Sequence, residues 1–384
     1  MSRLSSVFRE SPLSAMSPGS VSSAPSPAAA PPSQGARRPR RAGRCAALLL
    51  PALFLIQAVP HAASGSGVTT TLTALSDATL IEDPNAVASG SGDRLFAGMN
   101  SQSTRRRAMV LFDIAGSVPA GSIIMAASLR LHMSQNAGGA DRVDVHRVLD
   151  SWGEGGSVAS GGSGAPAQPG DATWLYRFFD TLTWMAPGGD IDPVSRAALV
   201  VDTVGPYEWT GAPLVDDAQE WLDAPTENHG WVLIGNESAP QTAKRFDARE
   251  HTNPSVRPTL TLVFIPPAGS VPDGATIPGP PLTVAPAAGG SVTIDWSASC
   301  VTTDTDYAVY EGDLTGDFSN HAPLVCSTGG ALTLTVPPTT GSRYYLVVPH
   351  NGSVEGSYGT ASPGGARGPS PSACLPQRTG LSCH

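Results

Sequence analysis

The sequence predicts an all-β protein in which a jelly-roll-like β-sandwich is followed by a smaller β-sandwich. Three observations predict this class. Many short runs alternate apolar and polar residues, which is the period of a half-buried strand. Glycine and proline, with 42 and 36 residues, supply the turns that many short strands need. Only one short stretch has helical spacing, so helices contribute little to the expected fold.

The first strand-rich block covers residues 65–265 and is expected to form the larger sandwich. Its strand-like runs are VTTTLTAL (68–75), DRLFAGM (93–99), RRAMVLFDI (106–114), ASLRLHMS (127–134), RVDVHRVL (142–149), ALVVDTV (198–204), GWVLIGN (230–236), KRFDARE (244–250) and TLTLVFI (259–265). Residues 213–224 place apolar side chains at helical spacing and predict one short helix that caps the sandwich. Residues 153–172 are rich in Gly, Ser, Ala and Pro and are expected to be a mobile loop.

A Pro/Gly-rich stretch then predicts a domain boundary. Residues 266–281, PPAGSVPDGATIPGPP, are expected to be a linker. Residues 282–365 form a second strand block, with the runs SVTIDW (291–296), DYAVYEG (306–312), ALTLTV (331–336) and RYYLVVP (343–349). Residues 366–384 are expected to be a polar tail that contains two cysteines.

Residues 1–64 combine a disordered tail with an export signal. The basic stretch RRPRRAGR (37–44) precedes the apolar run CAALLLPALFLIQAV (45–59), and small residues follow at 62–64. These are the three parts of a secretory signal, and the apolar run is short for a membrane span of about 20 residues. An uncleaved N-terminal anchor is the alternative. No second apolar run follows, so we expect a secreted or cell-surface protein with no membrane contact after signal cleavage.

The charge distribution excludes some partners. Without residues 1–64 the chain keeps 16 basic and 31 acidic residues, and this acidic balance argues against nucleic acid and against anionic membranes as partners. The search for an enzyme signature is negative, because GxSxG, HExxH, GxGxxG and the P-loop pattern do not occur. We therefore expect a protein without catalytic residues.

Four cysteines of the last quarter predict disulfides. They are Cys300, Cys326, Cys374 and Cys383, an even number that an exported chain tolerates. Four cysteines allow three connectivities. We favour the pairs that are nearest in sequence, Cys300 with Cys326 and Cys374 with Cys383. A zinc site is the alternative, but no CxxC occurs and the spacings match no zinc pattern.

Five stretches of the first block follow one another as a succession of short motifs. In order along the chain they are Asp77-Ala-Thr-Leu-Ile at the entry strand; Arg107-Ala-Met-Val-Leu-Phe-Asp113-Ile with Val118-Pro-Ala-Gly-Ser-Ile-Ile and Ala127-Ser-Leu-Arg-Leu; Ser151-Trp-Gly-Glu-Gly; Thr173-Trp with Trp184-Met-Ala-Pro-Gly-Gly-Asp190; and Phe246-Asp-Ala-Arg-Glu250 with Arg257-Pro-Thr-Leu. This succession resembles the DNRLRE family, which is also classed among carbohydrate-binding modules. Ala248 stands where the family usually has Ser, and Ser122 where it has Ala. The resemblance covers residues 72–265, about half of the chain.

The resemblance implies a jelly roll of bacterial exported proteins with no catalytic activity of its own. Some relatives in the family bind acidic polysaccharides such as alginate. The second block resembles the fibronectin type III-like modules of exported bacterial proteins, through Trp296, Asp306-Tyr-Ala-Val-Tyr-Glu-Gly312 and Tyr345-Leu-Val-Val-Pro.

Three tryptophans and two arginines are the candidate ligand-binding residues. Trp152, Trp174 and Trp184 fall in or beside the 153–172 segment, where flat aromatic faces could stack on sugar rings. Alternation along a strand places Arg105 and Arg107 on one face and Arg106 on the other, and a guanidinium can grip the carboxylate of a uronate sugar. The alternatives are structural: tryptophans that cover the sandwich end, and arginines at a solvated strand edge.

Two further groups are candidates for structural roles. Arg249, Glu250 and Arg257 are expected to pin the closing strand to its neighbours through charge pairs. Asp77, Glu82, Asp83 and Asp93 could supply oxygen ligands for a structural Ca²⁺, although their spacing fits no calcium-loop motif and no cofactor is required.

Two functions remain open from the sequence. The first is a module that binds polysaccharide or a cell-surface glycan, with exposed tryptophans near residues 153–190 as its mark. The second is a structural or adhesive surface protein that contacts other proteins, which buried tryptophans and an exposed apolar or edge-strand patch would favour.

Overall fold

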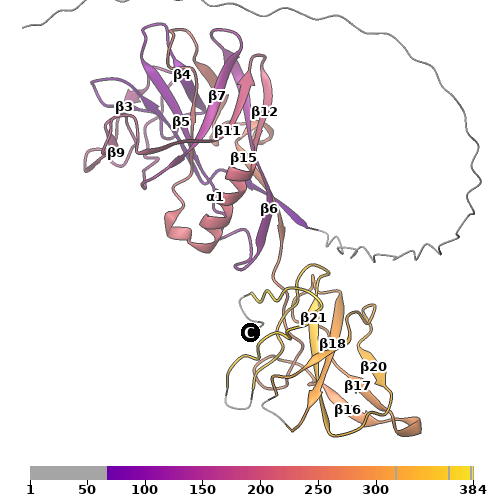
Figure 1. Ribbon diagram of the computed structural model, residues 1–384. Coiled ribbons are helices and arrows are strands. Elements are labelled where there is room, and N and C mark those ends of the chain that lie inside the picture. The colour runs from indigo at the N-terminus through magenta and orange to yellow at the C-terminus, as the bar shows by residue number, and fades with distance from the viewer. Residues whose placement is uncertain (1–66, 316–317, 362–363, 381–382, 384) are drawn as a thin grey trace, which may run out of the picture. The chain divides into compact units, whose positions relative to one another are not determined.

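The computed structural model describes residues 67–315, 318–361, 364–380 and 383 (Figure 1). The described chain is predominantly β, as the sequence predicts. Cys45 and the export signal expected over residues 1–64 lie outside these residues. No helix within the described ranges is long and apolar enough to cross a membrane.

Eleven strands between residues 68 and 265 form one antiparallel sheet. They are β1 (Val68–Thr73), β2 (Ser76–Ile81), β4 (Arg94–Met99), β5 (Arg105–Leu111), β6 (Ile123–Asn136), β7 (Asp141–Val148), β11 (Ile191–Val201), β12 (Gly205–Thr210), β13 (Trp231–Ile234), β14 (Lys244–Asp247) and β15 (Thr259–Ile265). All nine runs that the sequence predicts in this region overlap one of these strands. Strand β12 was not predicted, and β2 was expected only from the family resemblance, as the entry strand that holds Asp77-Ala-Thr-Leu-Ile.

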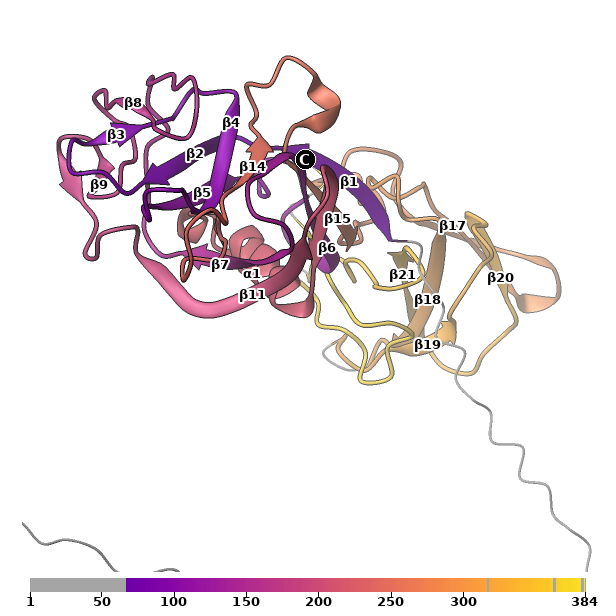
Figure 2. The same cartoon turned by 90° about the horizontal axis from the view of Figure 1, so that it is seen from above.

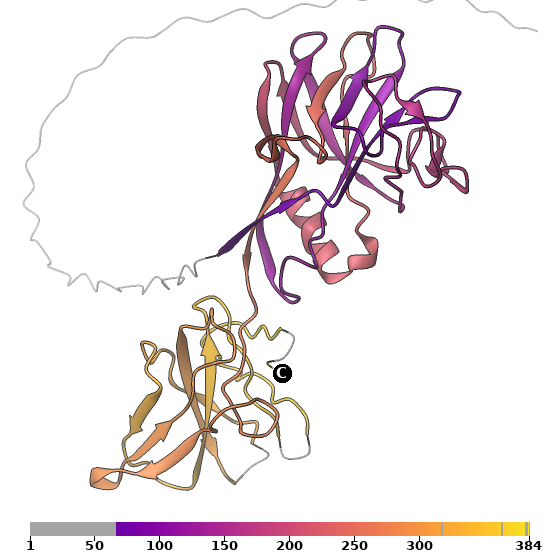
Figure 3. The ribbon, with the colours of Figure 1, turned by 180° about the vertical axis from the view of Figure 1, so that it is seen from behind.

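Strand β4 makes this sheet curl over its own core. Its first part pairs with β14, and its last residues, Gly98 and Met99, pair with β5. Gly98 has a φ of 113°, and a Cβ there would come within 2.8 Å of the Thr242 carbonyl oxygen. Only glycine suits this backbone. β4 thus joins two groups of strands. One group is β1, β6, β12, β14 and β15, and the other is β2, β5, β7, β11 and β13. The sheet curls so that the two groups face one another (Figures 2 and 3).

The main core lies between these two groups of strands. In β6, Ala127, Leu129, Leu131 and Met133 are buried, while the residues between them are partly exposed or exposed. The same alternation in β15 buries Leu260, Leu262 and Phe264. The period-two spacing of apolar residues therefore identifies the side of each strand that faces the core, as the sequence predicts.

One helix, α1 (Ala212–Asp223), closes part of this core. The prediction of a short helix over residues 213–224 is confirmed, and four of the five apolar residues at helical spacing are buried: Leu214, Ala218, Trp221 and Leu222. A proline in the first turn fits the helix start, because its missing N–H has no helical partner there. The indoles of Trp221 and Trp231 lie 4.6 Å apart at their ring centroids.

The Gly/Ser-rich segment 153–172 is more structured than predicted. The short strands β3 (Val87–Ala88) and β8 (Ala165–Pro166) pair, and so do β9 (Tyr176–Phe178) and β10 (Leu182–Thr183). The buried Asp171 carboxylate accepts hydrogen bonds from the backbone N–H groups of Ser157 (3.3 Å) and Gln168 (2.6 Å). These bonds fix the segment to itself, which the composition did not reveal. Single 3₁₀ turns lie at Pro225–Glu227 and Pro254–Val256.

The C-terminal region holds two three-stranded sheets. Their strands are β16 (Thr283–Pro286), β17 (Val292–Asp295) and β20 (Thr333–Val336), then β18 (Asp306–Asp313), β19 (Ala322–Val325) and β21 (Arg343–His350), with a 3₁₀ turn at Ala288–Gly290. Trp296, Tyr307 and Val347 belong to the core of this region. Part of the segment expected as a linker packs here, because Val271 contacts that core and the Gly269 N–H donates to Asp304.

The disulfides correct the pairing that we favoured from sequence proximity. The bonds are Cys300–Cys383 and Cys326–Cys374, with Cα–Cα distances of 5.6 and 5.5 Å. The physical reason is that residues 366–380 are not a free tail. They run back along the C-terminal region, where the Arg378 N–H donates to Glu355, and the Glu355 N–H donates to Pro376. Both bonds indicate an extracellular, oxidising environment.

Candidate functional site

A polar cavity of about 540 Å³ lies among strands β4, β5, β6 and β14 and the loops beside them. We call it the amide pocket, because five amide side chains line it together with one aromatic ring and two guanidinium groups. These residues are Asn100, Gln102, Gln135, Asn136, Gln241, Phe96, Arg106 and Arg245. They come from β4 and the loop after it, β5, the end of β6, and β14 with the loop before it. Gly162 and Ser163 complete the wall.

The charge of the amide pocket is positive. None of the described residues that line it is acidic. Burial lowers the pKa of Arg106, and burial together with the nearby Arg94 lowers the pKa of Arg245, but both guanidinium groups remain charged. Arg106 is 4% exposed, and its Nε donates to the Gly162 carbonyl at 2.6 Å. A buried arginine held in this way is positioned before any ligand arrives.

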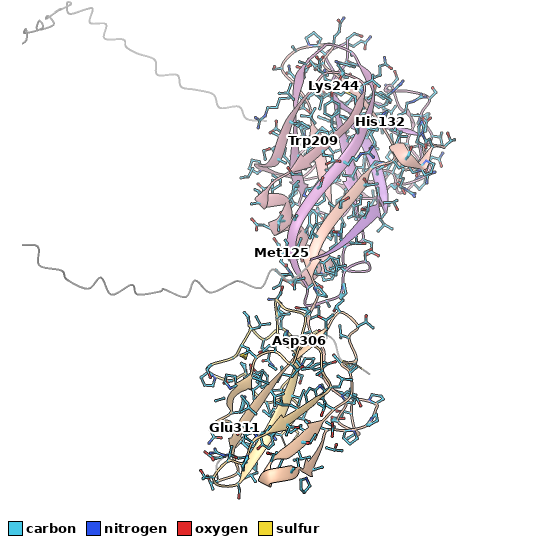
Figure 4. All side chains as sticks on the ribbon, turned by 90° about the vertical axis from the view of Figure 1, so that its right-hand side faces the viewer. Met125, His132, Trp209, Lys244, Asp306 and Glu311 are labelled. Carbon is cyan, nitrogen blue, oxygen red and sulfur yellow. A yellow bond between two sulfur atoms is a disulfide. The ribbon has the colours of Figure 1, made fainter. Side chains whose placement is uncertain are left out.

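Lys244 holds one wall of the amide pocket in place. It is the only lysine in the chain and is fully buried. Its Nζ donates to Asn136 Oδ1 (2.7 Å), the Gly139 carbonyl (2.5 Å) and Asp141 Oδ2 (2.9 Å). These bonds fix the turn between β6 and β7. Figure 4 shows Lys244 near the end of the large sheet that lies away from Met125.

The loop after β4 is fixed by its own side chain. The Asn100 Oδ1 atom accepts hydrogen bonds from the N–H groups of Gln102 (3.0 Å) and Thr104 (2.9 Å). The Asn100 carbonyl accepts from the Gln241 N–H at 3.1 Å. The two loops that carry Gln102 and Gln241 are thus tied to one another across the amide pocket.

The three candidate tryptophans are buried. Trp152, Trp174 and Trp184 are 9%, 5% and 5% exposed and belong to one apolar cluster with Leu80 and Met109. The indole N–H of Trp152 donates to the His229 carbonyl, and that of Trp184 to the Thr173 carbonyl. None of the three rings has an open face, so their role in stacking on sugars stays a prediction that this arrangement does not support.

Arg105 and Arg107 lie over the ring of Trp174. Their guanidinium carbons are 4.8 and 4.9 Å from the ring centroid. Each is paired with a carboxylate, Arg105 with Glu82 at 2.7 Å and Arg107 with Glu237 at 2.8 Å. The structure thus unites three of the predicted ligand-binding residues, but both charges already have a partner. Of the three consecutive arginines of β5, Arg106 lies on the opposite face, as alternation predicts, and lines the amide pocket.

The four acids considered for Ca²⁺ do not meet. Glu82 pairs with Arg105, and the Asp83 carboxylate accepts from Asn85. Asp93 lies 3.6 Å from Arg94. Asp77 instead lies with Glu154 and Glu250, and one ligand atom from each of these three carboxyls falls within 4.8 Å of the others. The predicted set of four ligands therefore stays a prediction: its members are close in sequence, but their side chains contact different neighbours.

Arg249 contacts all three carboxyl groups of this cluster of Asp77, Glu154 and Glu250. Its guanidinium pairs with Glu154 at 2.6 Å and with Glu250 at 2.9 Å, and its N–H donates to Asp77 Oδ2 at 2.7 Å. Arg257 donates to the His251 carbonyl at 2.8 Å. Two of the three residues expected to pin the closing strand therefore share one charge network with Asp77. Glu154, which the sequence analysis did not single out, lies in the stretch Ser151-Trp-Gly-Glu-Gly.

Comparisons with known proteins assign no family. No family profile matches the chain, and no curated protein matches it. Among solved structures, the glycoside hydrolase domain of Endo-D from Streptococcus pneumoniae is 10% identical, with 74% of this chain and 34% of that chain covered and a TM-score of 0.17. A beta-1,2-glucanase from Parabacteroides distasonis is 10% identical, with 83% and 37% covered and a TM-score of 0.16.

The chain spans about a third of the length of these two solved structures. TM-scores this low carry no argument about fold or function.

Proposed function

We propose that this protein is an exported, non-catalytic polysaccharide-binding protein whose amide pocket holds an acidic sugar. The observation that carries the proposal is the lining of the amide pocket, with five amides, two arginines and no acid among its described residues. An amide offers both donors and acceptors to sugar hydroxyls, and a guanidinium matches a carboxylate with two parallel hydrogen bonds. Phe96 adds an apolar surface for the C–H face of a ring.

The resemblance to the DNRLRE family supports the same proposal. Its motifs occur in order over residues 72–265, and some members of that family bind acidic polysaccharides. We further propose that residues 65–265 are a jelly roll of this type. Residues 282–365 would then be a fibronectin type III-like domain beyond a boundary in 266–281. The curled antiparallel sheet with its core between two groups of strands is compatible with the jelly roll.

Affinity electrophoresis tests the proposal. The purified protein with both disulfides formed is run through gels that contain alginate, polygalacturonate, xylan or a neutral glucan. We expect retardation by a uronate polymer and not by the neutral glucan. Arg245→Ala should weaken this retardation about tenfold or more, because one charge-assisted contact is worth roughly 1.5–3 kcal/mol.

Arg142→Ala is the matched control. Arg142 is an exposed arginine on β7 that pairs with Asp144, so its loss changes the net charge by the same amount and leaves the amide pocket intact. Equal weakening of the retardation in both variants would mean that net charge alone causes it. No retardation on any polymer would overturn the proposal.

A structural or adhesive role is the second candidate function. The burial of Trp152, Trp174 and Trp184 favours it. So does the edge strand β11, whose Val194 and Val200 are 58% and 60% exposed. An exposed apolar sheet edge is a surface on which another protein chain can pair. Self-association that Val200→Lys abolishes, in a protein that no glycan retards, would support this role.

A further inference from the structure

Three carboxyl groups from distant parts of the chain converge away from the residues that line the amide pocket. Asp77 lies near the start of β2, Glu154 follows β7 in the chain, and Glu250 follows β14. One oxygen of each falls within 4.8 Å of the other two. Three segments separated by about 80 to 100 residues therefore bring acidic groups to a single point.

Two of the six carboxyl oxygens are buried without any hydrogen-bond partner. Asp77 is 1% exposed, and its Oδ2 accepts from the Arg249 N–H, but its Oδ1 has no partner. Glu250 Oε2 is also buried and unpartnered. A buried oxygen without a partner destabilises the fold, and more so when it carries charge. A cation bound by this cluster would give both oxygens a partner.

The charge balance points to the same conclusion. Among the described residues, Arg249 is the one cation that forms an ion pair with the cluster, and it already bonds to Glu154 with both Nε and Nη2. With all three carboxyls ionised, one guanidinium leaves an excess of two negative charges. Either protons or a bound cation must offset the excess charge.

We propose that Asp77, Glu154 and Glu250 bind a divalent cation of the calcium type. The donors are hard carboxylate oxygens only, with no histidine or cysteine in the cluster, and such donors suit Ca²⁺ rather than zinc. The ion takes Asp77 Oδ1 and Glu250 Oε2 as ligands, one Glu154 oxygen as a third, and water for the rest of its six to eight positions. It joins β2, the segment beyond β7 and the residues after β14.

Calorimetry and thermal unfolding in calcium chloride test this site. The chelator-treated protein should bind about one Ca²⁺, with an affinity in the range of roughly 0.1–1 mM that extracellular modules show. At calcium about tenfold above the dissociation constant, Tm should rise by about 3 °C or more. Glu250→Gln should weaken binding about tenfold and remove most of the rise in Tm. Asp77→Asn should do the same if it folds.

Asp83→Asn is the matched control, because Asp83 is an acid outside the cluster. It should bind calcium and gain in Tm as the unaltered protein does. The proposal is overturned if the chelator-treated protein shows neither heat of binding nor a shift in Tm, which would mean that protons offset the charge. It is equally overturned if Glu250→Gln binds as tightly as the unaltered protein. Neither result depends on whether a glycan enters the amide pocket.

Discussion

The region up to residue 265 and the C-terminal region are stabilised in different ways. The first packs a large continuous core that includes three fully buried tryptophans, Trp209, Trp221 and Trp231, and it contains no disulfide among its described residues. The second has two small apolar clusters and both disulfides. The difference follows from size, since a small domain buries too little apolar surface to offset its conformational entropy without covalent links.

The largest effect that this comparison predicts is a cavity in the large core. Trp231→Ala should lower the free energy of unfolding by about 4–5 kcal/mol, because it leaves a void and removes the indole N–H that donates to the buried Asp217 Oδ2 at 2.9 Å. Urea unfolding measures the loss. Leu149→Ala, at a residue that is 52% exposed, should change it by less than about 0.5 kcal/mol. A loss below about 2 kcal/mol for Trp231→Ala would show that the core collapses around the void.

Removal of one disulfide should destabilise the C-terminal region. The Cys326–Cys374 bond closes 48 residues, so replacing both cysteines by serine should cost about 4 kcal/mol on the chain-entropy view. Hydrogen exchange followed by mass spectrometry locates the effect. Exchange should accelerate in β18 and β21 and stay unchanged in β6 and β7. Equal acceleration in all four strands would mean that the two regions unfold as one cooperative unit.

A smaller effect concerns an ion pair at the rim of the large sheet. The hydrogen-bonded pair with Arg105 lowers the pKa of Glu82 to about 2, from an ordinary value of 4.5. A lowered pKa means that Glu82 stabilises the fold above about pH 4.5 and that this contribution is lost as the pH falls towards 2. Glu82→Gln should therefore lower Tm at pH 7 and hardly change it near pH 2.

Because Arg105 and Glu82 are partly exposed, the effect of Glu82→Gln at pH 7 should not exceed about 1 kcal/mol. Glu208→Gln provides the control, since Glu208 lies 4.0 Å from Arg130 and is 60% exposed. A Tm difference for Glu82→Gln that is as large at pH 2 as at pH 7 would contradict the assignment of the pair.

Period-two spacing located most strands because burial alone decides which residues of a half-buried strand are apolar. It missed β12, where Gly205 and Pro206 are turn-forming residues, and β2, where the buried Asp77 interrupts the apolar run. The capping helix was found from spacing, but the burial of Asp217 was not, because it depends on Trp231 and Arg196 from other strands.

The candidate sites were harder to predict than the strands. The amide pocket draws Asn100 and Gln241 from two loops and Gln135 from the end of β6, so no local pattern marks it. The carboxyl cluster joins Asp77, Glu154 and Glu250, which lie in three of the stretches that carry the family resemblance. The predicted calcium ligands were instead acids that are close in sequence. The pairing of the strands places their side chains beside different partners. Composition also suggested that residues 153–172 are mobile, whereas Asp171 holds the segment through backbone hydrogen bonds.

The burial of Lys244 has a practical consequence for chemical modification. The sequence contains no other lysine, so the folded protein exposes no side-chain amine, and an amine-directed ester can acylate only its N-terminal α-amine. A fluorophore or a biosensor surface can therefore be attached at a single position without mutagenesis. Acylation of Lys244 itself would report that the turn between β6 and β7 has opened.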